Sequence, residues 1–140
     1  MKVIQATAST FWAEDDADKR FYIVGTLGSG LLRFEVIARL ADGTRGNVRG
    51  RDFFDAMMQH FGVKVRIIEG TWTRAHGLTT NLDLFNQATA AGLGPEQAAL
   101  VATKTGQWAD AHGFTKVVFQ KLQPRNAPGH YDEVVVRFTL

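Results

Sequence analysis

A change in hydrophobic period between residues 32 and 61 restricts the fold of this chain more than any other feature. Over residues 32–40 apolar residues alternate mostly with charged ones, which predicts a strand with one buried face. From residue 53 apolar residues recur every three or four positions, which predicts an amphipathic helix closed by Gly62. The members of this apolar stripe are Phe53, Phe54, Met57, Met58 and Phe61. Strands and helices must therefore share one core.

The same patterns predict the remaining elements. Strands are expected over residues 21–27, 63–68, 114–122 and 134–140, and helices over residues 80–92 and 94–111. Gly106 could break the second of these helices. The strand–helix–strand order favours a parallel pairing, and the C-terminal strands favour an antiparallel hairpin. We therefore expect an α+β fold with a central mixed β-sheet flanked by helices.

Composition narrows the class of protein. The 140 residues are 45% hydrophobic and suit a single domain spanning residues 1–140. No cysteine is present, which removes disulfides, thiol nucleophiles and thiolate metal sites. The chain has neither the apolar run of a signal peptide nor an apolar stretch of membrane-spanning length. We expect a cytoplasmic protein, or an effector delivered by another route, without a membrane partner.

Charged residues are unevenly distributed although the formal net charge is only +2. That net charge is too small to indicate nucleic acid by itself. The acidic run over residues 14–18 is interpreted as a solvated loop, since further oxygen ligands for a divalent cation are not evident. The four histidines share no metal-ligand spacing, so no metal site is predicted. They are His60, His76, His112 and His130.

A basic loop joins the strand at residues 32–40 to the helix that follows. Its glycines allow close backbone approach, while helix N–H groups and guanidinium groups suit a phosphate. The residues expected to bind the phosphate are Arg45, Gly46, Asn47, Val48, Arg49, Gly50 and Arg51. An alternative is that Asp42-Gly43 turns a hairpin whose return strand covers residues 44–48.

This strand, the motif Arg-Gly-x-x-x-Gly-Arg and the paired apolar helix together resemble the pyrophosphate-binding motif of the GNAT superfamily of N-acetyltransferases. The family loop is written Gln or Arg, x, x, Gly, x, Gly or Ala. Arg45 and Gly50 match its ends, whereas Val48 stands at the middle Gly. The strand at 63–68 and the run 108–114 continue the resemblance. It implies an acyl-CoA N-acyltransferase-like fold, with acetyl-CoA or another acyl-CoA bound at residues 45–51.

The resemblance also implies a reaction, in which an amine attacks the thioester directly after losing a proton to a base. Glu35 lies mid-strand and is the residue expected to act as this base through water; the alternative is an exposed charge paired with Arg33 or Arg39. Ala109 stands where the family often has a Tyr that protonates the departing thiolate, and Tyr22, Tyr131 and His112 are candidates for this acid by residue type alone. The region before residue 31 is short for the strand and two helices that build the acceptor pocket. The sequence identifies neither the acceptor amine nor the oligomeric state.

A second resemblance concerns residues 70–114. Its residues are Gly70-Thr71-Trp72, Asn81-Leu82, Phe85-Asn86, Glu96, Ala98-Ala99, Thr103-Lys104-Thr105-Gly106 and Gly113-Phe114. They resemble a stretch found near the C-termini of bacterial secreted polymorphic toxins. The alternative functions are therefore a bacterial toxin or effector module, a domain whose arginines hold nucleic-acid phosphates, and a non-catalytic interaction domain.

Overall fold

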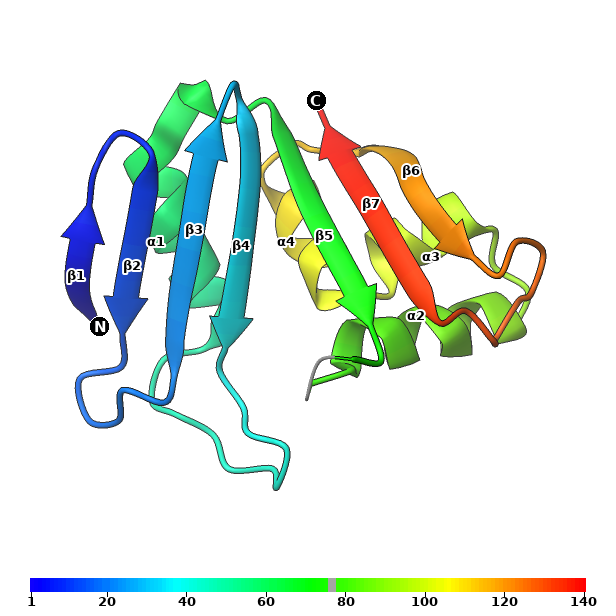
Figure 1. Cartoon of the computed structure of the whole chain (residues 1–140), viewed down its shortest axis with the longest axis horizontal. Coiled ribbons are helices and arrows are strands. Elements are labelled where there is room, and N and C mark those ends of the chain that lie inside the picture. Colours follow the sequence, from blue (N-terminus) through cyan, green and yellow to red (C-terminus); the bar gives the residue numbers. More distant parts are fainter. Residues whose placement is uncertain (76–77) are drawn as a thin grey trace. The chain divides into compact units, whose positions relative to one another are not determined.

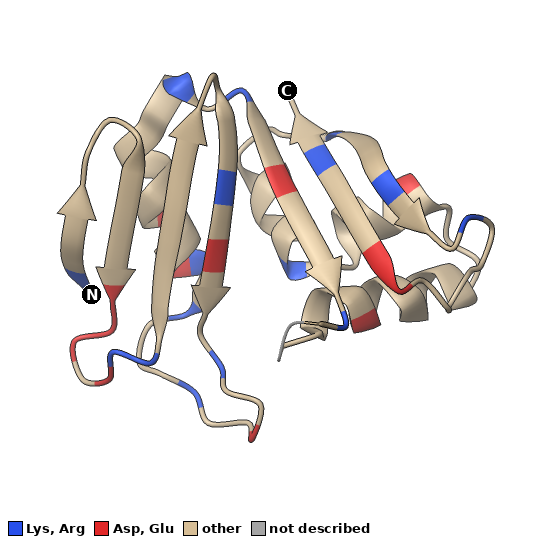
Figure 2. Ribbon diagram, viewed as in Figure 1, with Lys and Arg blue, Asp and Glu red and all other residues tan. Residues whose placement is uncertain are grey.

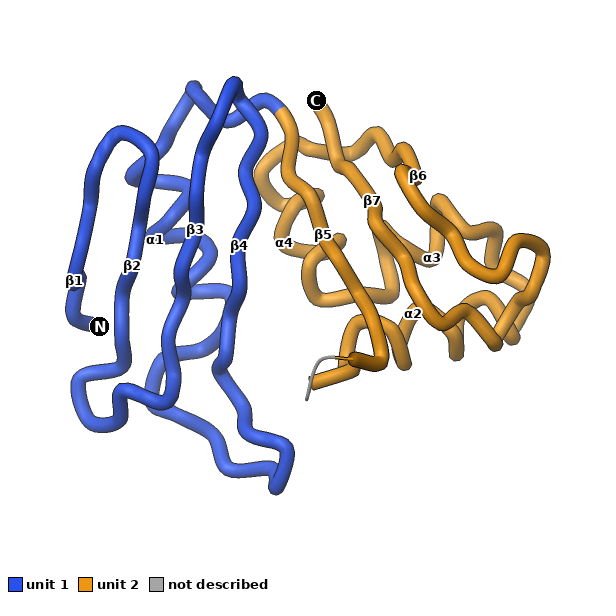
Figure 3. The backbone as a smooth tube through the Cα atoms, viewed as in Figure 1, with its two compact units in different colours: residues 1–66 blue, residues 67–140 orange. Residues whose placement is uncertain are grey.

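The computed structural model describes residues 1–75 and 78–140, which form seven β-strands, four α-helices and one short 3-10 helix. The α+β class predicted from the sequence is confirmed. The chain divides into two compact units, unit 1 covering residues 1–66 and unit 2 covering residues 67–140 (Figure 3). None of the described helices combines the length and apolarity needed to cross a membrane.

Unit 1 is an antiparallel four-stranded sheet with one helix. Strands β1 (Lys2–Ala6), β2 (Thr10–Glu14), β3 (Tyr22–Gly28) and β4 (Leu31–Ile37) pair in chain order. Helix α1 (Gly50–Phe61) covers one face of this sheet (Figure 1). The other face is covered by no helix of unit 1.

The core of unit 1 confirms the apolar stripe that the sequence predicted for α1. All five residues of the stripe are buried, and the Phe54 ring packs edge-on against Phe34 of β4 at 5.2 Å between centroids. Gly25 of β3 lies directly under Met57, so a side chain at residue 25 would overlap the methionine sulfur. The helix ends as predicted at Gly62, which has φ of +60°. Sequence reasoning missed β1 and β2.

Unit 2 is a three-stranded antiparallel sheet with three helices. Its strands β5 (Ile67–Thr73), β6 (Lys116–Gln123) and β7 (Glu133–Thr139) lie in the order β5-β7-β6, and β6 and β7 form the predicted C-terminal hairpin. Helices α2 (Thr80–Ala90), α3 (Pro95–Val101) and α4 (Lys104–Ala111) connect β5 to β6. Phe85 of α2 anchors the core, where its ring contacts Trp72, Phe119 and Tyr131.

Two predicted elements were misplaced. The strand expected over residues 63–68 begins only at Ile67, because the chain first makes the 3-10 helix Gly62–Lys64 and leaves Val63 99% exposed. Its expected end at residue 68 is also wrong, since Trp72 packs over Gly70 and the strand continues to Thr73. The helix expected over residues 94–111 is two helices. They separate at Thr103, not at Gly106, because the Thr103 hydroxyl accepts a hydrogen bond from the Gly106 N–H and caps α4.

Candidate functional site

The loop between β4 and α1 begins as a short hairpin. Leu40 N–H donates to the carbonyl of Thr44 at 2.8 Å, and Gly43 N–H donates to the carbonyl of Leu40 at 2.9 Å. Arg39 and Arg45 form an isolated antiparallel bridge across this turn. The hairpin that the sequence left open as an alternative is therefore present, although it is shorter than residues 44–48. It leads directly into α1, so the basic loop keeps its place before the helix.

Arg39 and Arg45 stand side by side on this hairpin. Residues that face each other across an antiparallel pair have Cβ atoms about 4.5–5.5 Å apart, and like charges placed so are unfavourable. Both side chains are exposed. No carboxylate among the described residues forms an ion pair with either guanidinium. Two adjacent cations without an internal counterion favour the binding of an anion.

The other two arginines of the loop do have partners. Arg49 binds Asp52 with 2.9 Å between Nε and Oδ2, and Arg51 lies 3.9 Å from Asp55. The hydrogen bond from Arg49 lowers the pKa of Asp52, and Asp52 raises the pKa of Arg49. Exposed pairs of this kind contribute little to stability, so a stronger anion could replace the carboxylates. Figure 2 shows the basic residues along this loop.

Backbone donors in the loop are fewer than the sequence suggested. The N–H groups of Asn47 and Val48 both donate to Oδ2 of Asp15, at 2.6 and 3.1 Å. In the described part of the chain, the N–H groups of Gly50 and Arg51 donate to no acceptor, as is usual in a first helical turn. These two groups are the backbone donors that the loop offers to an anion.

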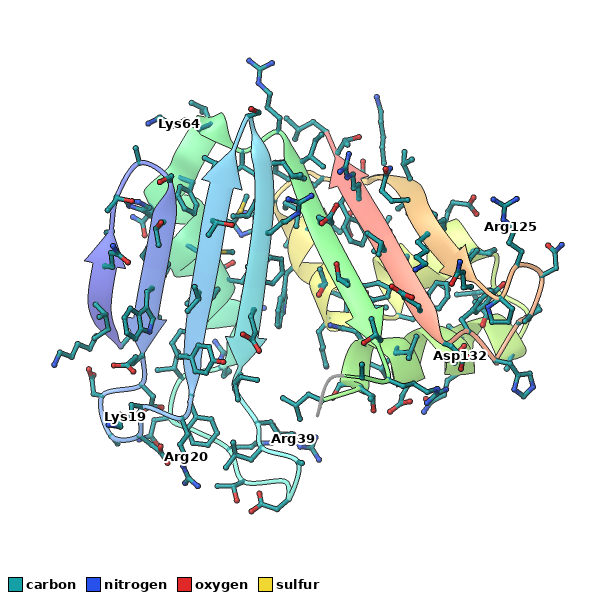
Figure 4. The ribbon with its side chains drawn as sticks, viewed as in Figure 1. Lys19, Arg20, Arg39, Lys64, Arg125 and Asp132 are labelled. Carbon is teal, nitrogen blue, oxygen red and sulfur yellow. The ribbon has the colours of Figure 1, made fainter. Side chains whose placement is uncertain are left out.

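Further positive charge lies at the same end of unit 1. Lys19 and Arg20 belong to the turn between β2 and β3, and Figure 4 shows them at the end of unit 1 that also carries Arg39. Arg20 binds Asp18 at 2.7 Å, which raises the pKa of Arg20. The hydroxyl and N–H of Thr44 lower the pKa of Asp42, and this carboxylate remains charged at neutral pH. The site is thus an exposed surface of mixed charge on which two arginines, Arg39 and Arg45, form no ion pair with the described residues.

Glu35 lies where the sequence placed it, on the exposed face of β4 opposite Phe34 and Val36. Its neighbour there is Tyr22 of β3, whose hydroxyl donates a hydrogen bond to the carboxylate. Partial burial and the negative charge of Glu35 raise the pKa of Tyr22, so this tyrosine stays protonated at neutral pH. The carboxylate therefore has a fixed neighbour and an open approach from the uncovered face of the unit 1 sheet.

Other residues considered as catalytic groups are buried in the core or lie at a helix end. Ala109, at the position of the family's Tyr, is fully buried in α4, and Tyr131 is 2% exposed in the core of unit 2. His112 is the C-cap residue of α4. Across residues 1–75 and 78–140 no cluster of three or more potential ligands could hold a metal ion; His76 lies outside these ranges.

The residues that resemble a toxin stretch also form structural contacts. Asn81 accepts hydrogen bonds from the N–H groups of Lys104 and Thr105, which ties the start of α2 to the start of α4. Asn86 exchanges two hydrogen bonds with the backbone of Tyr131, at 2.9 and 2.7 Å. Asn81 and Asn86 are therefore used to hold the fold together, whereas Glu96 and Lys104 of the same stretch are exposed.

Comparison of the chain with protein-family models, with curated proteins and with solved structures found no match.

Sequence reasoning missed the place of Arg39 and Asp15 in the site, and it considered Tyr22 only as an acid and not as a partner of Glu35. Arg39 had only a partial signal, because a two-residue turn at Asp42-Gly43 would place it opposite Gly46, whereas the observed turn covers residues 41–43 and places it opposite Arg45. Asp15 had no such signal, since its partners Asn47 and Val48 lie more than 30 positions further along the chain. Tyr22 meets Glu35 only through the register of β3 with β4.

Proposed function

We propose that this chain is an acyl-CoA-binding, N-acyltransferase-like domain whose β4–α1 loop holds the phosphate groups of the cofactor. The observation that carries the proposal is the pair Arg39 and Arg45, which face each other and have no ion-pair partner in the described residues. The free N–H groups of Gly50 and Arg51 lie a few residues further on at the positive end of α1. A diphosphate would accept hydrogen bonds from both the guanidinium groups and these N–H groups.

The order of elements supports the same proposal. Strand β4, the basic loop, α1 and β5 follow one another along the chain, which is the order that the resemblance to N-acetyltransferases implies. One difference concerns the acceptor. Residues 7–9 join β1 directly to β2, where the family has helices that build the acceptor pocket. The acceptor amine would therefore reach Glu35 across the sheet face that no helix of unit 1 covers.

The proposed reaction is direct transfer. Glu35 first accepts a proton from the ammonium form of the acceptor through one water, with Tyr22 holding the carboxylate. The neutral amine nitrogen then attacks the thioester carbonyl carbon, the carbon–sulfur bond breaks, and coenzyme A leaves as the thiolate. The new amide nitrogen releases its remaining extra proton to solvent, and solvent protonates the thiolate. The acceptor is an amine whose identity the site does not specify.

Two measurements test this proposal. Coenzyme A should raise the melting temperature of the protein, because a ligand that binds only the folded state stabilises it. Glu35→Gln should lower the rate of acetyl transfer to an offered amine about 10²–10⁴-fold, and the deficit should shrink at high pH as the amine deprotonates unaided. Glu14→Gln, on the same face of β2, is the matched control. No stabilisation by millimolar coenzyme A would refute the proposal, and binding without transfer would limit the function to binding.

A second candidate follows from the exposure of the arginines. Arg39 and Arg45 are exposed loop residues, a placement that also suits the phosphates of a nucleic-acid backbone. This candidate predicts affinity for RNA or DNA that falls steeply and log-linearly with salt, together with no heat on titration with coenzyme A.

A further inference from the structure

Asp15 is a buried acid in a turn that the sequence indicated to be solvated. Its side chain is 4% exposed, although it belongs to the acidic run at residues 14–18. Oδ1 accepts a hydrogen bond from Ala17 N–H at 2.9 Å, and Oδ2 accepts from Asn47 and Val48. These backbone hydrogen bonds, that of Ala17 first, lower the pKa of Asp15. The carboxylate is thus ionised and fully used inside the fold.

The contact with Asp15 fixes the middle of the β4–α1 loop. Asn47 and Val48 lie between Arg45, at the end of the hairpin, and Gly50, at the start of α1. Gly46 permits this close approach, because a Cβ there would lie 2.7 Å from the Phe21 ring and 2.9 Å from Oδ2 of Asp15. Holding the two middle residues fixes both groups of anion donors on either side of them.

We propose that Asp15 is a positioning residue for the phosphate site. It holds Asn47 and Val48 so that the arginine pair Arg39–Arg45 and the N–H groups of Gly50 and Arg51 keep one mutual geometry before the ligand arrives. Pre-organisation strengthens binding because the loop does not have to be ordered when the ligand binds. The inference rests on the proposed function, since it concerns the affinity of the same site.

The direction in which coenzyme A affinity changes when Asp15 is removed distinguishes a positioning role from a purely electrostatic one. A negative charge beside an anion site weakens anion binding, so removing that charge should strengthen binding if the charge alone mattered. Removing a positioning residue should instead weaken binding, because the loop must then become ordered when the ligand binds. Each residue that must be ordered on binding weakens affinity about tenfold.

Asp16 supplies a matched control for this test. It is the next residue of the same turn, its side chain is 70% exposed, and it pairs with the N-terminal amine of Met1 at 2.8 Å without contacting the loop. Asp15→Ala and Asp16→Ala therefore remove the same charge from the same turn. Calorimetric titration with coenzyme A should show affinity falling about tenfold or more in Asp15→Ala and changing less than about threefold in Asp16→Ala.

Two further variants are expected to weaken coenzyme A binding to a smaller or similar extent. In Asp15→Asn the amide oxygen can accept from Asn47 and Val48, but the amide nitrogen then faces the Ala17 N–H, so affinity should lie between wild type and Asp15→Ala. Gly46→Ala keeps the carboxylate, but its Cβ would overlap the Phe21 ring and Oδ2 of Asp15 and push the loop away from Asp15, so it should also weaken binding. If Asp15→Ala does not fold, these two variants carry the test.

A readout without ligand separates positioning from general destabilisation. Amide hydrogen exchange in Asp15→Ala should lose protection at Asn47 and Val48, while amides of β3 and α1 keep theirs. Tighter coenzyme A binding in Asp15→Ala, or equal affinities in Asp15→Ala and Asp16→Ala, would overturn the inference and leave the proposed function intact. A wild type that binds no coenzyme A would overturn both.

Discussion

Two regions, one in each unit, use their polar side chains in different ways. In unit 2 the buried side chain of Asn86 exchanges hydrogen bonds with the backbone of Tyr131 and so joins α2 to the segment before β7. In unit 1 the β4–α1 loop leaves the guanidinium groups of Arg39 and Arg45 without an ion pair in the described residues. Saturated polar groups specify a fold, whereas unsaturated ones on a fixed loop are available to a ligand.

This difference bears on the two sequence resemblances. The resemblance to a toxin stretch lies mostly on residues of unit 2 that cap helices or fill the core, such as Thr103 and Phe85. The resemblance to the pyrophosphate loop lies on an exposed segment of unit 1, where Arg45 forms no ion pair with the described residues. Most of the first set therefore builds the fold, and the second offers the chemistry on which a function can be proposed.

The largest effect is expected at the saturated network of unit 2. Asn86→Ala would leave the N–H and the carbonyl of Tyr131 buried without a partner, and each orphaned group costs about 1–3 kcal/mol. The free energy of unfolding should fall by about 2–6 kcal/mol, measured by urea denaturation. Coenzyme A affinity should not change in the folded fraction. A loss below about 1 kcal/mol would show that water replaces the side chain.

A somewhat smaller loss is expected where α3 meets α4. A Cβ on Gly106 would overlap the carbonyl oxygen of Ala99, which is backbone and cannot move aside alone. Gly106→Ala should therefore destabilise the protein by about 1–3 kcal/mol despite its better helix propensity. Gly28→Ala is a useful control, since a Cβ there would meet nothing within 4 Å. Equal stability of the two variants would contradict the packing described for unit 2.

Acid stability should depend on Asp15 in unit 1. Its folded pKa lies below the ordinary value, so the carboxylate stabilises the fold above that ordinary value of about 3.9 and stops doing so as pH falls through the folded pKa. Thermal unfolding between pH 7 and pH 2 should show a shallower acid decline in Asp15→Asn than in wild type. Identical profiles for Asp15→Asn and wild type would mean that Asp15 is not held as described.

The smallest effect on stability is expected at the arginine pair. Arg39→Gln with Arg45→Gln removes a like-charge contact, so the free energy of unfolding should rise or change by less than about 1 kcal/mol. The melting temperature in the absence of ligand measures this. A large loss of stability would show that the pair has an internal partner and would remove the contrast between the units.

Local sequence patterns were sufficient for much of the fold. The stripe of α1 and the alternation in β4 and β7 are periodic over short stretches, so burial could be assigned without knowing the neighbours. The break before α4 was predicted at the wrong residue because the helix cap depends on Thr103, while Gly106 is required by packing against Ala99. Propensity alone does not distinguish a helix-breaking glycine from one that permits close contact.

The site was less accessible to sequence reasoning than the fold. Residues 45–51 were placed correctly before a helix, but the use of the Asn47 and Val48 N–H groups by Asp15 depends on contacts more than 30 positions apart. In sequence the acidic run containing Asp15 cannot be distinguished from a solvated turn. In the structure Asp16 is exposed to solvent, whereas its neighbour Asp15 is buried. Hydrogen bonds between residues far apart in the sequence therefore decide which charged side chains of a cluster remain able to bind a ligand.

The most direct test of the central claim is calorimetric titration of coenzyme A into the wild type and into the variant with both Arg39→Gln and Arg45→Gln. Arg74→Gln is the matched control, because Arg74 in unit 2 is already paired with Asp132 at 3.3 Å. We predict saturable binding by the wild type and by Arg74→Gln, with affinity at least about tenfold weaker in the double variant, since two charge-assisted contacts are lost. Equal affinity of all three proteins, or no heat with the wild type, would contradict the claim that the β4–α1 loop binds the cofactor's phosphates.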